Sequence, residues 1–347
     1  MTGSRFPLKD MAAIASFSAQ LPGADHAAAG AARAHQASLT KPPGSLGRLE
    51  ELAVFLAGWQ GTARPRIERA EALVFAGNHG ICAQGVNPYP QAVTALMVEN
   101  FRRGGAAINQ LCKVAGAELS IVALDLDRPT RDFTEVPAMM EAECLGALNR
   151  GAQAALTAVE MGADILILGE MGIGNSTVAA ALTAALFGGA AADWVGPGTG
   201  SDAAGMQRKI SVIDRGLARH RGLGPEATLA ALGGREQAAI CGAVLAARVH
   251  RIPVLLDGFI CTASAAVLHA IDPQLLDHCL VGHCSAEPGH VRLLKIIGKR
   301  PLLDLDMRLG EGTGAALALG LVRAALACHN GMATFAEAKI ESGIAPE

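Results

Sequence analysis

The chain has 347 residues, with 29 Lys and Arg against 32 Asp and Glu, and 41 of its residues are glycine. This length allows about two domains or one large α/β unit, and the nearly balanced charge does not indicate binding to nucleic acid or to a membrane surface. Only 3% of the residues are aromatic. The predicted core therefore consists of Ala, Leu, Val and Ile with many glycines, which suits helices packed closely on a parallel sheet.

No membrane span, export signal or disulfide framework is expected. The two longest apolar stretches, 178–192 and 315–328, are too short for a span. The N-terminus carries Lys9 and Asp10 without a long apolar segment, so we expect a cytoplasmic protein that makes no membrane contact. None of the eight cysteines forms a C-x-x-C pair, which favours buried free thiols over a metal or redox site.

The elements follow a regular order along the chain. The first ~65 residues are predicted to be helical, and Arg64-Pro65-Arg66 is predicted to be a boundary. Beyond it, short apolar runs predict strands at Ala72–Phe75, Leu119–Leu124, Ile165–Leu168, Val254–Leu256, Cys279–Val281 and Leu302–Leu305. Helical patterns between them include Val93–Phe101, Val178–Phe187, Ala203–His220, Glu236–Val249 and Ala315–His329. This alternation predicts an α/β fold with a mostly parallel sheet of about six strands and helices on both faces.

Polar and acidic residues follow nearly every predicted strand. These strand ends are 77–80, 125–127, 169–176, 257–258, 282–287 and 306–312. In open α/β sheets, ligands bind outside the carboxyl ends of the strands. The loops are therefore predicted to form a single pocket.

One of these strand ends and a further segment of the chain are rich in glycine and lead into predicted helices. Residues 169–176 and 196–202 can offer backbone N–H groups to an anion, although tight turns that need positive φ explain the glycines equally well. Lys209 lies two turns into the helix that follows the second loop. It can reach a phosphate from there, and the alternative is a solvated surface lysine.

Glu311 has glycine on both sides and lies where a predicted strand leads into a helix that starts near Thr313. The glycines leave room for a ligand, and a carboxylate near a helix N-terminus is favoured as the anion. From spacing alone, a helix-capping role and a catalytic role are equally consistent with this position.

Missing motifs narrow the reaction class. The only adjacent acidic pair, Glu50-Glu51, is far from any predicted strand end, so we expect neither a magnesium–pyrophosphate site nor any other metal or cofactor. Histidines in H-E-x-x-H spacing and a G-x-S-x-G serine motif are absent. A nucleotide-dependent oxidoreductase would need a glycine fingerprint that Asn78-His79-Gly80 does not supply. A ligand-binding sensor without catalysis is the other alternative.

Taken in order, the segments resemble one family, the nicotinate-nucleotide–dimethylbenzimidazole phosphoribosyltransferases of cobalamin biosynthesis. The resemblance extends from about residue 40 to residue 335 in the printed sequence. The matching pieces are Lys41–Glu50, Ala76–Gly80, Gly85–Thr94, Gly169–Asn175, Gly196–Asp202, Leu256–Phe259 and Arg308–Gly312.

The resemblance implies an enzyme that moves 5-phosphoribose from nicotinate mononucleotide to 5,6-dimethylbenzimidazole, with inversion at the sugar carbon. The products are α-ribazole 5′-phosphate and nicotinate. It also implies a Rossmann-like domain over residues 66–329, a small helical domain formed by residues 1–65 with about 330–347, and a homodimer.

The resemblance also implies roles for individual residues. Glu311 matches the general base, and Glu170 matches a second acidic residue that faces the reacting carbon. The phosphate and nucleotide cradle corresponds to Gly172, Gly174, Asn175, Gly200, Ser201 and Lys209. The wall around the benzimidazole corresponds to Tyr89, Pro90, Met97 and Leu309. Two departures from the family pattern, at Asn78 and at Leu96-Met97, predict a more apolar ring pocket and leave the choice of acceptor base open.

Overall fold

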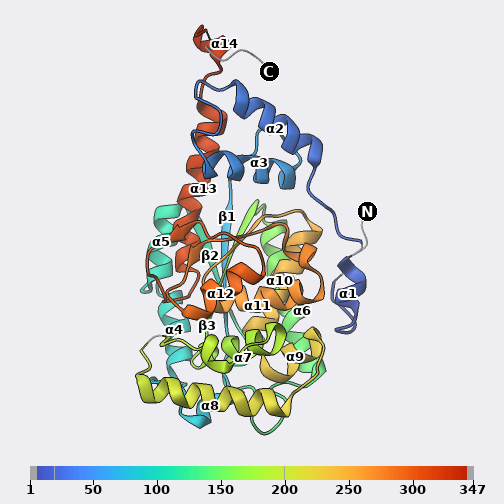
Figure 1. Ribbon diagram of the computed structural model, residues 1–347, viewed down its shortest axis with the longest axis vertical. Helices are drawn as coiled ribbons and strands as arrows, with labels where there is room; N and C mark the ends of the chain where they lie inside the picture. The colour runs from blue at the N-terminus through green and yellow to red at the C-terminus, as the bar shows by residue number, and fades with distance from the viewer. Residues whose placement is uncertain (1–5, 19, 199, 342–347) are drawn as a thin grey trace.

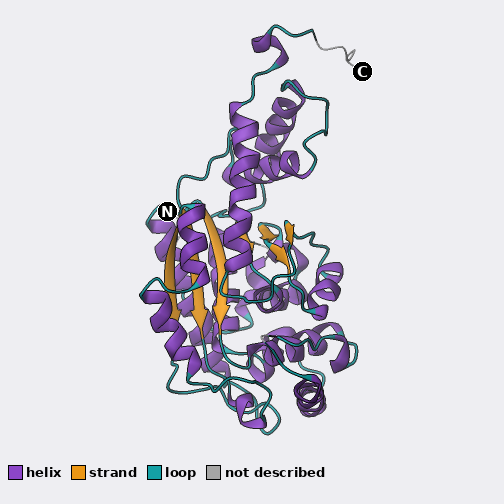
Figure 2. Ribbon diagram, turned by 90° about the vertical axis from the view of Figure 1, so that its left-hand side faces the viewer, coloured by secondary structure: helices purple, strands orange, loops and turns teal. Residues whose placement is uncertain are grey.

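The computed structural model describes residues 6–18, 20–198 and 200–341. A five-stranded parallel sheet in the order β2-β1-β3-β4-β5 forms its centre (Figures 1 and 2). The strands are β1 Ala70–Ala76, β2 Ala117–Ala123, β3 Ile165–Met171, β4 Val254–Leu256 and β5 Cys279–Val281. The predicted α/β class with a parallel sheet is confirmed.

The strand order places a switch point between β1 and β3. From β1 the chain moves outward to the edge strand β2, and then returns to the other side of β1 to begin β3. The two strands pair in parallel with Phe75 opposite Glu170 and Ala76 opposite Met171. In doubly wound sheets of this order, the crevice beyond such a switch point binds the ligand. The fold thus places Glu170 and Met171 at the expected site.

Helices cover both faces of the sheet, as the sequence predicted. Because neighbouring residues of a strand point to opposite faces, Leu73 and Phe75 of β1 pack on one side and Ala72 and Val74 on the other. The first side holds α6 Glu141–Glu160, α7 Asn175–Phe187, α9 Pro225–Leu232, α10 Arg235–Val249 and α11 Phe259–Ile271. The second holds α3 Arg48–Gln60, α4 Val93–Arg102, α5 Ala107–Ala115 and α13 Thr313–Gly331.

Glycine allows two of the covering helices to touch along their backbones. A Cβ atom at Gly151 of α6 would collide with the carbonyl of Ala239 in α10, and one at Gly242 of α10 would collide with the carbonyl of Leu148 in α6. A side chain at either position would force the helices apart. The high glycine and alanine content of the chain therefore serves close helix packing.

The remaining helices extend the body at both ends. They are α1 Ala13–Ser18, α2 His26–Ser38, α8 Ala203–Arg219, α12 Pro288–Ile296 and α14 Phe335–Ala338. At one end, α2 and α3 lie beside the last turns of α13 (Figure 1). There the Gln36 amide lies 2.8 Å from Nδ1 of His329, and Leu39 forms a bridge with Thr334. These contacts join residues 36–39 to the C-terminal segment at 329–334.

The first described residues pack elsewhere. Phe6, Leu8 and Ile14 belong to the core cluster on the α6 side of the sheet, and the Leu8 backbone N–H donates to Asn149 Oδ1 at 2.8 Å. The sequence analysis grouped this segment with the helical domain, whereas the structure places it against the main body. Residues 342–347 of that predicted domain lie outside the described part of the chain.

The sixth predicted strand joins a separate sheet. It is β7 Leu303–Asp304, which pairs in parallel with β6 His283–Cys284. The chain continues past the carboxyl end of β5, and the backbone N–H of Leu302 donates to the carbonyl of Val281 at 2.9 Å. The central sheet therefore has five strands, and this small pair extends it towards the site.

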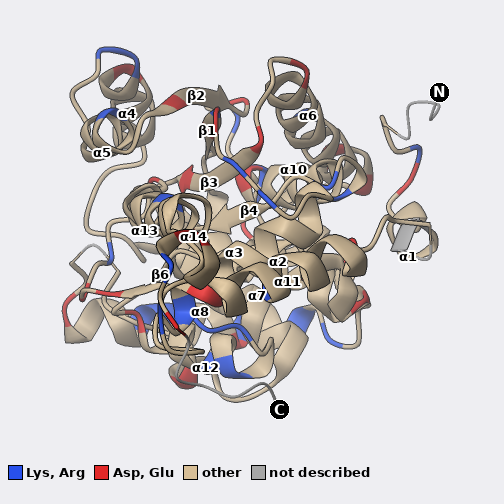
Figure 3. Cartoon of the chain, turned by 90° about the horizontal axis from the view of Figure 1, so that it is seen from above, with Lys and Arg blue, Asp and Glu red and all other residues tan. Residues whose placement is uncertain are grey.

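The surface of the described chain is mixed in charge. Basic and acidic residues are interspersed over the outer helices and loops (Figure 3). No helix among the described residues is both long enough and apolar enough to cross a membrane.

Candidate active site

A pocket opens at the carboxyl ends of β3, β4 and the small β6–β7 sheet. It encloses about 820 Å³, including its open mouth. The lining residues are 86–89, 170–176, Gly198, Ser201, Lys209, 258–260, His283, Ser285, Glu287 and 308–310. Four of the six strand ends predicted to contribute therefore converge: those at 169–176, 257–258, 282–287 and 306–312.

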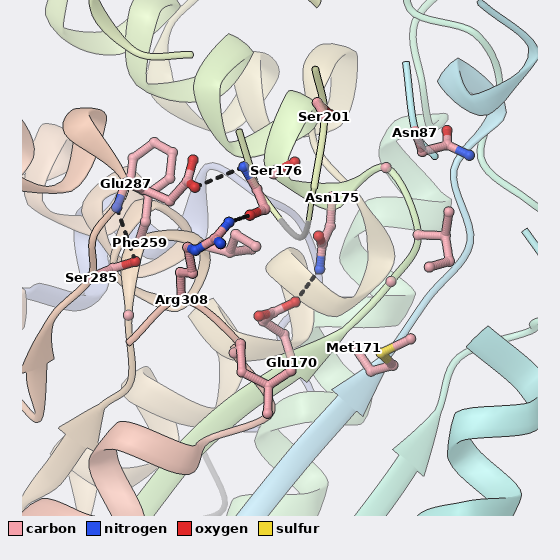
Figure 4. A pocket seen from close by; sticks show the side chains of 18 of the residues that line it. Asn87, Glu170, Met171, Asn175, Ser176, Ser201, Phe259, Ser285, Glu287 and Arg308 are labelled. Atoms are coloured by element: carbon pink, nitrogen blue, oxygen red, sulfur yellow. Dashed lines mark hydrogen bonds between the residues drawn. The ribbon is translucent and has the colours of Figure 1, made fainter. Parts of the chain in front are cut away.

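Glu170 forms the acidic end of the pocket. It lies near the carboxyl end of β3, only 4% exposed, and its carboxylate accepts a hydrogen bond from the Asn175 side-chain amide (Figure 4). Burial raises the pKa of Glu170 well above its usual range, and the nearby carboxylates of Glu236, Asp257 and Glu311 raise it further. The carboxyl group of Glu170 therefore tends to stay protonated unless a positive charge lies beside it.

Glu311 lies beside Glu170, on an unusual turn. Gly310, Glu311 and Gly312 have φ values of 82°, 64° and 84°, so a residue with a side chain occupies the left-handed region between two glycines. The backbone N–H of Glu311 donates to the Glu170 carbonyl at 3.2 Å. Its side chain is buried, and Oε2 has no hydrogen-bond partner among the described residues. Such strain in a buried acid is typical of functional sites.

The same environment shifts the acidity of Glu311. Burial, reinforced by the charge of Asp257, raises the pKa of Glu311 from an ordinary 4.5 to about 7. Its carboxylate can therefore accept a proton near neutral pH. The sequence left open whether Glu311 caps the helix, and the structure gives that role to Asp257, which accepts hydrogen bonds from Gly312 N and Ala315 N at 3.1 and 3.0 Å.

Cationic side chains lie on another side of the pocket. Lys209 of α8 is only 3% exposed, and its Nζ donates to Ser176 Oγ at 3.3 Å, so it is not a solvated surface lysine. Burial lowers the pKa of Lys209, and the charge of Glu287 opposes that effect. Arg308 donates to the Gly198 carbonyl at 2.7 Å. The two cations can balance the charge of a phosphate.

Two positions in the loop between β3 and α7 require glycine. A Cβ atom at Gly172 would lie 2.8 Å from the Gly77 carbonyl, and one at Gly174, where φ is +91°, would lie 2.8 Å from Cys82 Sγ. Gly174 also precedes α7, which begins at Asn175 without a side-chain cap. The uncapped N–H groups at this helix start can bind an anion.

The structure brings together most of the residues predicted for the site. Those that line the pocket are Glu170, Gly172, Gly174, Asn175, Ser201, Lys209, Tyr89 and Leu309. Glu311 follows the lining residue Gly310 and does not itself line the pocket. Gly200 lines a neighbouring hollow with Ser201, and Thr199 in the same loop lies outside the described residues. Pro90 is exposed beside Tyr89, and Met97 packs against the core on the α4 face, so neither borders the pocket.

Sequence reasoning gave no role to several lining residues. Arg308, Glu287 and Phe259 surround the pocket together with Ser176 and Ser285 (Figure 4). Glu287 accepts a hydrogen bond from the Gly198 backbone N–H at 2.8 Å and so ties two loops together. Arg308 and Phe259 stand inside motifs that were already recognised, beside Leu309 and Gly258. Their position in those motifs was the sequence signal that could have identified Arg308 and Phe259 as site residues.

Comparisons with known proteins agree with this geometry. A phosphoribosyltransferase family model matches residues 21–340. The nicotinate-nucleotide–dimethylbenzimidazole phosphoribosyltransferase of Rhodobacter capsulatus is 66% identical over 96% of this chain and 98% of its own length. The protein of the same name from Novosphingobium aromaticivorans is 59% identical over 96% of this chain and 99% of its own length. A crystal structure of the Thermus thermophilus enzyme superposes with a TM-score of 0.87 at 43% identity, covering 92% of this chain and 100% of that one.

Proposed function

Because this chain belongs to the nicotinate-nucleotide–dimethylbenzimidazole phosphoribosyltransferase family, we propose that it transfers 5-phosphoribose from nicotinate mononucleotide to 5,6-dimethylbenzimidazole. The products are α-ribazole 5′-phosphate and nicotinate, in nucleotide-loop assembly of cobalamin. The observation that carries the proposal is a single pocket with a buried carboxylate, Glu170, on one side and Lys209 with a glycine loop on another.

We propose that the donor phosphate binds at the cationic side of the pocket. Lys209 and Arg308 supply charge there, while the N–H groups of the loop at Gly172 and Gly174, with Asn175, Gly200 and Ser201, supply directed donors. The ribose then extends towards Glu170. Holding the donor in this way would place its anomeric carbon between the two acids, and such orientation contributes much of the rate in transfer reactions.

In the proposed chemistry, one nitrogen of the acceptor ring forms a bond to the anomeric carbon as the bond from that carbon to the nicotinate ring nitrogen breaks. The bonding electrons leave with the nicotinate, whose ring nitrogen becomes neutral. The other ring nitrogen of the acceptor becomes acidic, and Glu311 accepts its proton. The Glu170 carboxylate stabilises the positive charge that develops on the sugar carbon.

We propose that the acceptor ring lies against Tyr89 and Leu309, which are 50% and 48% exposed at the pocket mouth. Large apolar side chains left exposed around a mouth are typical of surfaces that a ligand or partner covers. We propose a homodimer on this basis, which light scattering of the purified protein tests directly. The eight cysteines are all free, which supports our proposal of a cytoplasmic location.

The test of the proposed function is an assay of nicotinate release. The protein is incubated with nicotinate mononucleotide and dimethylbenzimidazole, and release is expected only when both are present. EDTA is expected to leave the rate unchanged, because the leaving ring becomes neutral without a metal. Binding of the donor with no release would favour a sensor, and release without the acceptor would favour a hydrolase.

A further inference from the structure

Asp257 has no role in the proposed chemistry, although it lies within a family motif and is only 1% exposed. It follows β4 and extends under the turn formed by Gly310, Glu311 and Gly312, which we call the 310–312 turn. Oδ2 of Asp257 accepts a hydrogen bond from Gly312 N at 3.1 Å, and Oδ1 accepts one from Ala315 N at 3.0 Å. A single carboxylate at the end of β4 thus anchors both the end of the turn and the start of α13.

The 310–312 turn has little other support. The hydroxyl of Thr313 donates to the Gly310 carbonyl at 2.7 Å, and the backbone of Glu311 donates to Glu170. Gly169 of β3 packs so closely on the turn that a Cβ atom there would collide with Gly312 N. Because Glu311 occupies a left-handed conformation that side chains disfavour, the turn needs contacts that hold it in place. The two hydrogen bonds to Asp257 are the charged ones, and charged hydrogen bonds are the stronger kind.

His283 lies against Asp257 on the other side. Its Nε2 lies 3.5 Å from Asp257 Oδ1, and both side chains are 1% exposed. The ring is confined, because a Cβ atom at Gly258 would lie 2.8 Å from Nε2 and one at Gly314 would collide with Cδ2. The ring therefore cannot move away without displacing backbone.

We propose that Asp257 is a positioning residue for the transfer reaction: its carboxylate fixes the 310–312 turn so that Glu311 is aimed at the acceptor ring, and His283 holds that carboxylate. This inference rests on the proposed role of Glu311 as the proton acceptor. Asp257 also acts through its charge, since it raises the pKa of Glu311. The other titratable groups close to Asp257 or Glu311 are Glu170 on β3, Cys261 on α11 and His283 on β6, and His290 on α12 lies beside His283.

The first variant is Asp257→Asn, which keeps the shape but offers one acceptor oxygen for two N–H groups. We expect kcat to fall at least ~10-fold, because the base is less well held, while the donor KM stays within about twofold, because the phosphate contacts are elsewhere. The acid limb of the kcat/KM profile should move to lower pH, since Glu311 loses a negative neighbour. The substrates are the same, so their own titration cancels in the comparison.

The second variant is His283→Gln, which removes the ring that lies 3.5 Å from Asp257 and leaves the carboxylate less confined. We expect kcat to fall while the donor KM stays within about twofold, as in Asp257→Asn, because the carboxylate under the 310–312 turn is less well held. A general loosening of the site would instead raise the donor KM in both variants. The control is Asp272→Asn: Asp272 also accepts a backbone hydrogen bond at a helix start, from Gln274 N at 2.9 Å, but lies away from the pocket. It should behave as the unsubstituted chain.

A kcat and a pH profile of Asp257→Asn that equal those of the unsubstituted chain would overturn the inference, as would a donor KM that rises strongly in both variants. If Asp257→Asn does not fold, an unchanged kcat in His283→Gln overturns it. An unsubstituted chain that releases no nicotinate would overturn the proposed function itself. An active chain with an impaired Glu311→Gln variant and a normal Asp257→Asn variant would overturn only this inference.

Discussion

Replacing Glu311 by Gln should slow the reaction and stabilise the fold at the same time. Gln is close in size, keeps the same backbone strain and cannot accept the proton from the acceptor ring. We expect kcat at neutral pH to fall by roughly 10²–10⁴, the range that a positioned general base contributes. Donor affinity should remain nearly unchanged, because the proposed phosphate site is formed by Lys209 and the glycine loops that line the pocket.

The pH dependence follows from the pKa of Glu311, which is about 7. At pH 5 only about 1% of such a group is ionised, against about half at pH 7, so the rate of the unsubstituted chain should fall by roughly 50-fold between pH 7 and pH 5. The variant lacks the titrating group. The ratio of the two rates should therefore shrink by about tenfold for each pH unit well below 7, and any titration of the substrates cancels in this ratio.

The stability effect has the opposite direction. A carboxyl whose pKa is raised by folding contributes fully to stability below its unfolded pKa of 4.5, and this contribution is lost as pH rises through about 7. The loss amounts to at most about 3 kcal/mol at pH 8. The Gln variant avoids it and should resist urea better at pH 8, with the advantage disappearing near pH 4.5. A rate ratio that does not change with pH, together with equal stability at pH 8, would refute the reasoning.

Three further substitutions test the rest of the pocket. Lys209→Ala should weaken donor binding by about 1.5–3 kcal/mol, the value of a charged hydrogen bond, and equal affinity in a calorimetric titration would remove Lys209 from the phosphate site. Arg308→Ala should weaken the donor in the same direction while leaving acceptor KM less changed, which steady-state kinetics can separate. Gly310→Ala should lower kcat with donor binding retained, because its Cβ would lie 2.5 Å from Glu170 Oε1 at a φ of +82°; a normal kcat would contradict the packing of the turn on Glu170.

The sequence predicted where the strands lie along the chain better than which strands pair with one another. The runs at 254–256 and 279–281 coincide with β4 and β5 because they are apolar, short and bounded by polar residues. The run at 302–305 has the same local pattern, yet it pairs with His283–Cys284. What decides its partner is that the chain continues past the end of β5, so Leu302 meets Val281. Local pattern carries no information about such a three-dimensional offset.

Some residues of the site could likewise be predicted from the sequence, and others could not. The family resemblance identified Glu170. It also gave Glu311 and the glycine loops roles that spacing alone had left open, because capping and tight turns explained them equally well. The spacing could not decide whether Lys209 is buried, since this depends on α8 packing against α7 at Ser176. The family resemblance placed Met97 at the acceptor ring, whereas the orientation of α4 turns that side chain towards the core. Helix orientation is set by tertiary packing, which periodicity alone does not fix.

Glu170 and Glu311 lie in different electrostatic environments, and this suits them to different proposed roles. Three carboxylates surround Glu170 and raise its pKa, so in the free site Glu170 is the group that most readily keeps a proton. A protonated carboxyl cannot stabilise a developing cation. The donor, however, brings a positive pyridinium ring, and a cation beside Glu170 favours its ionised form. Binding of the donor would therefore prepare Glu170 for its proposed role, whereas Glu311, with a pKa of about 7, is ready to accept a proton without such help. Exchanging the two roles would place the less readily ionised acid where a base is needed.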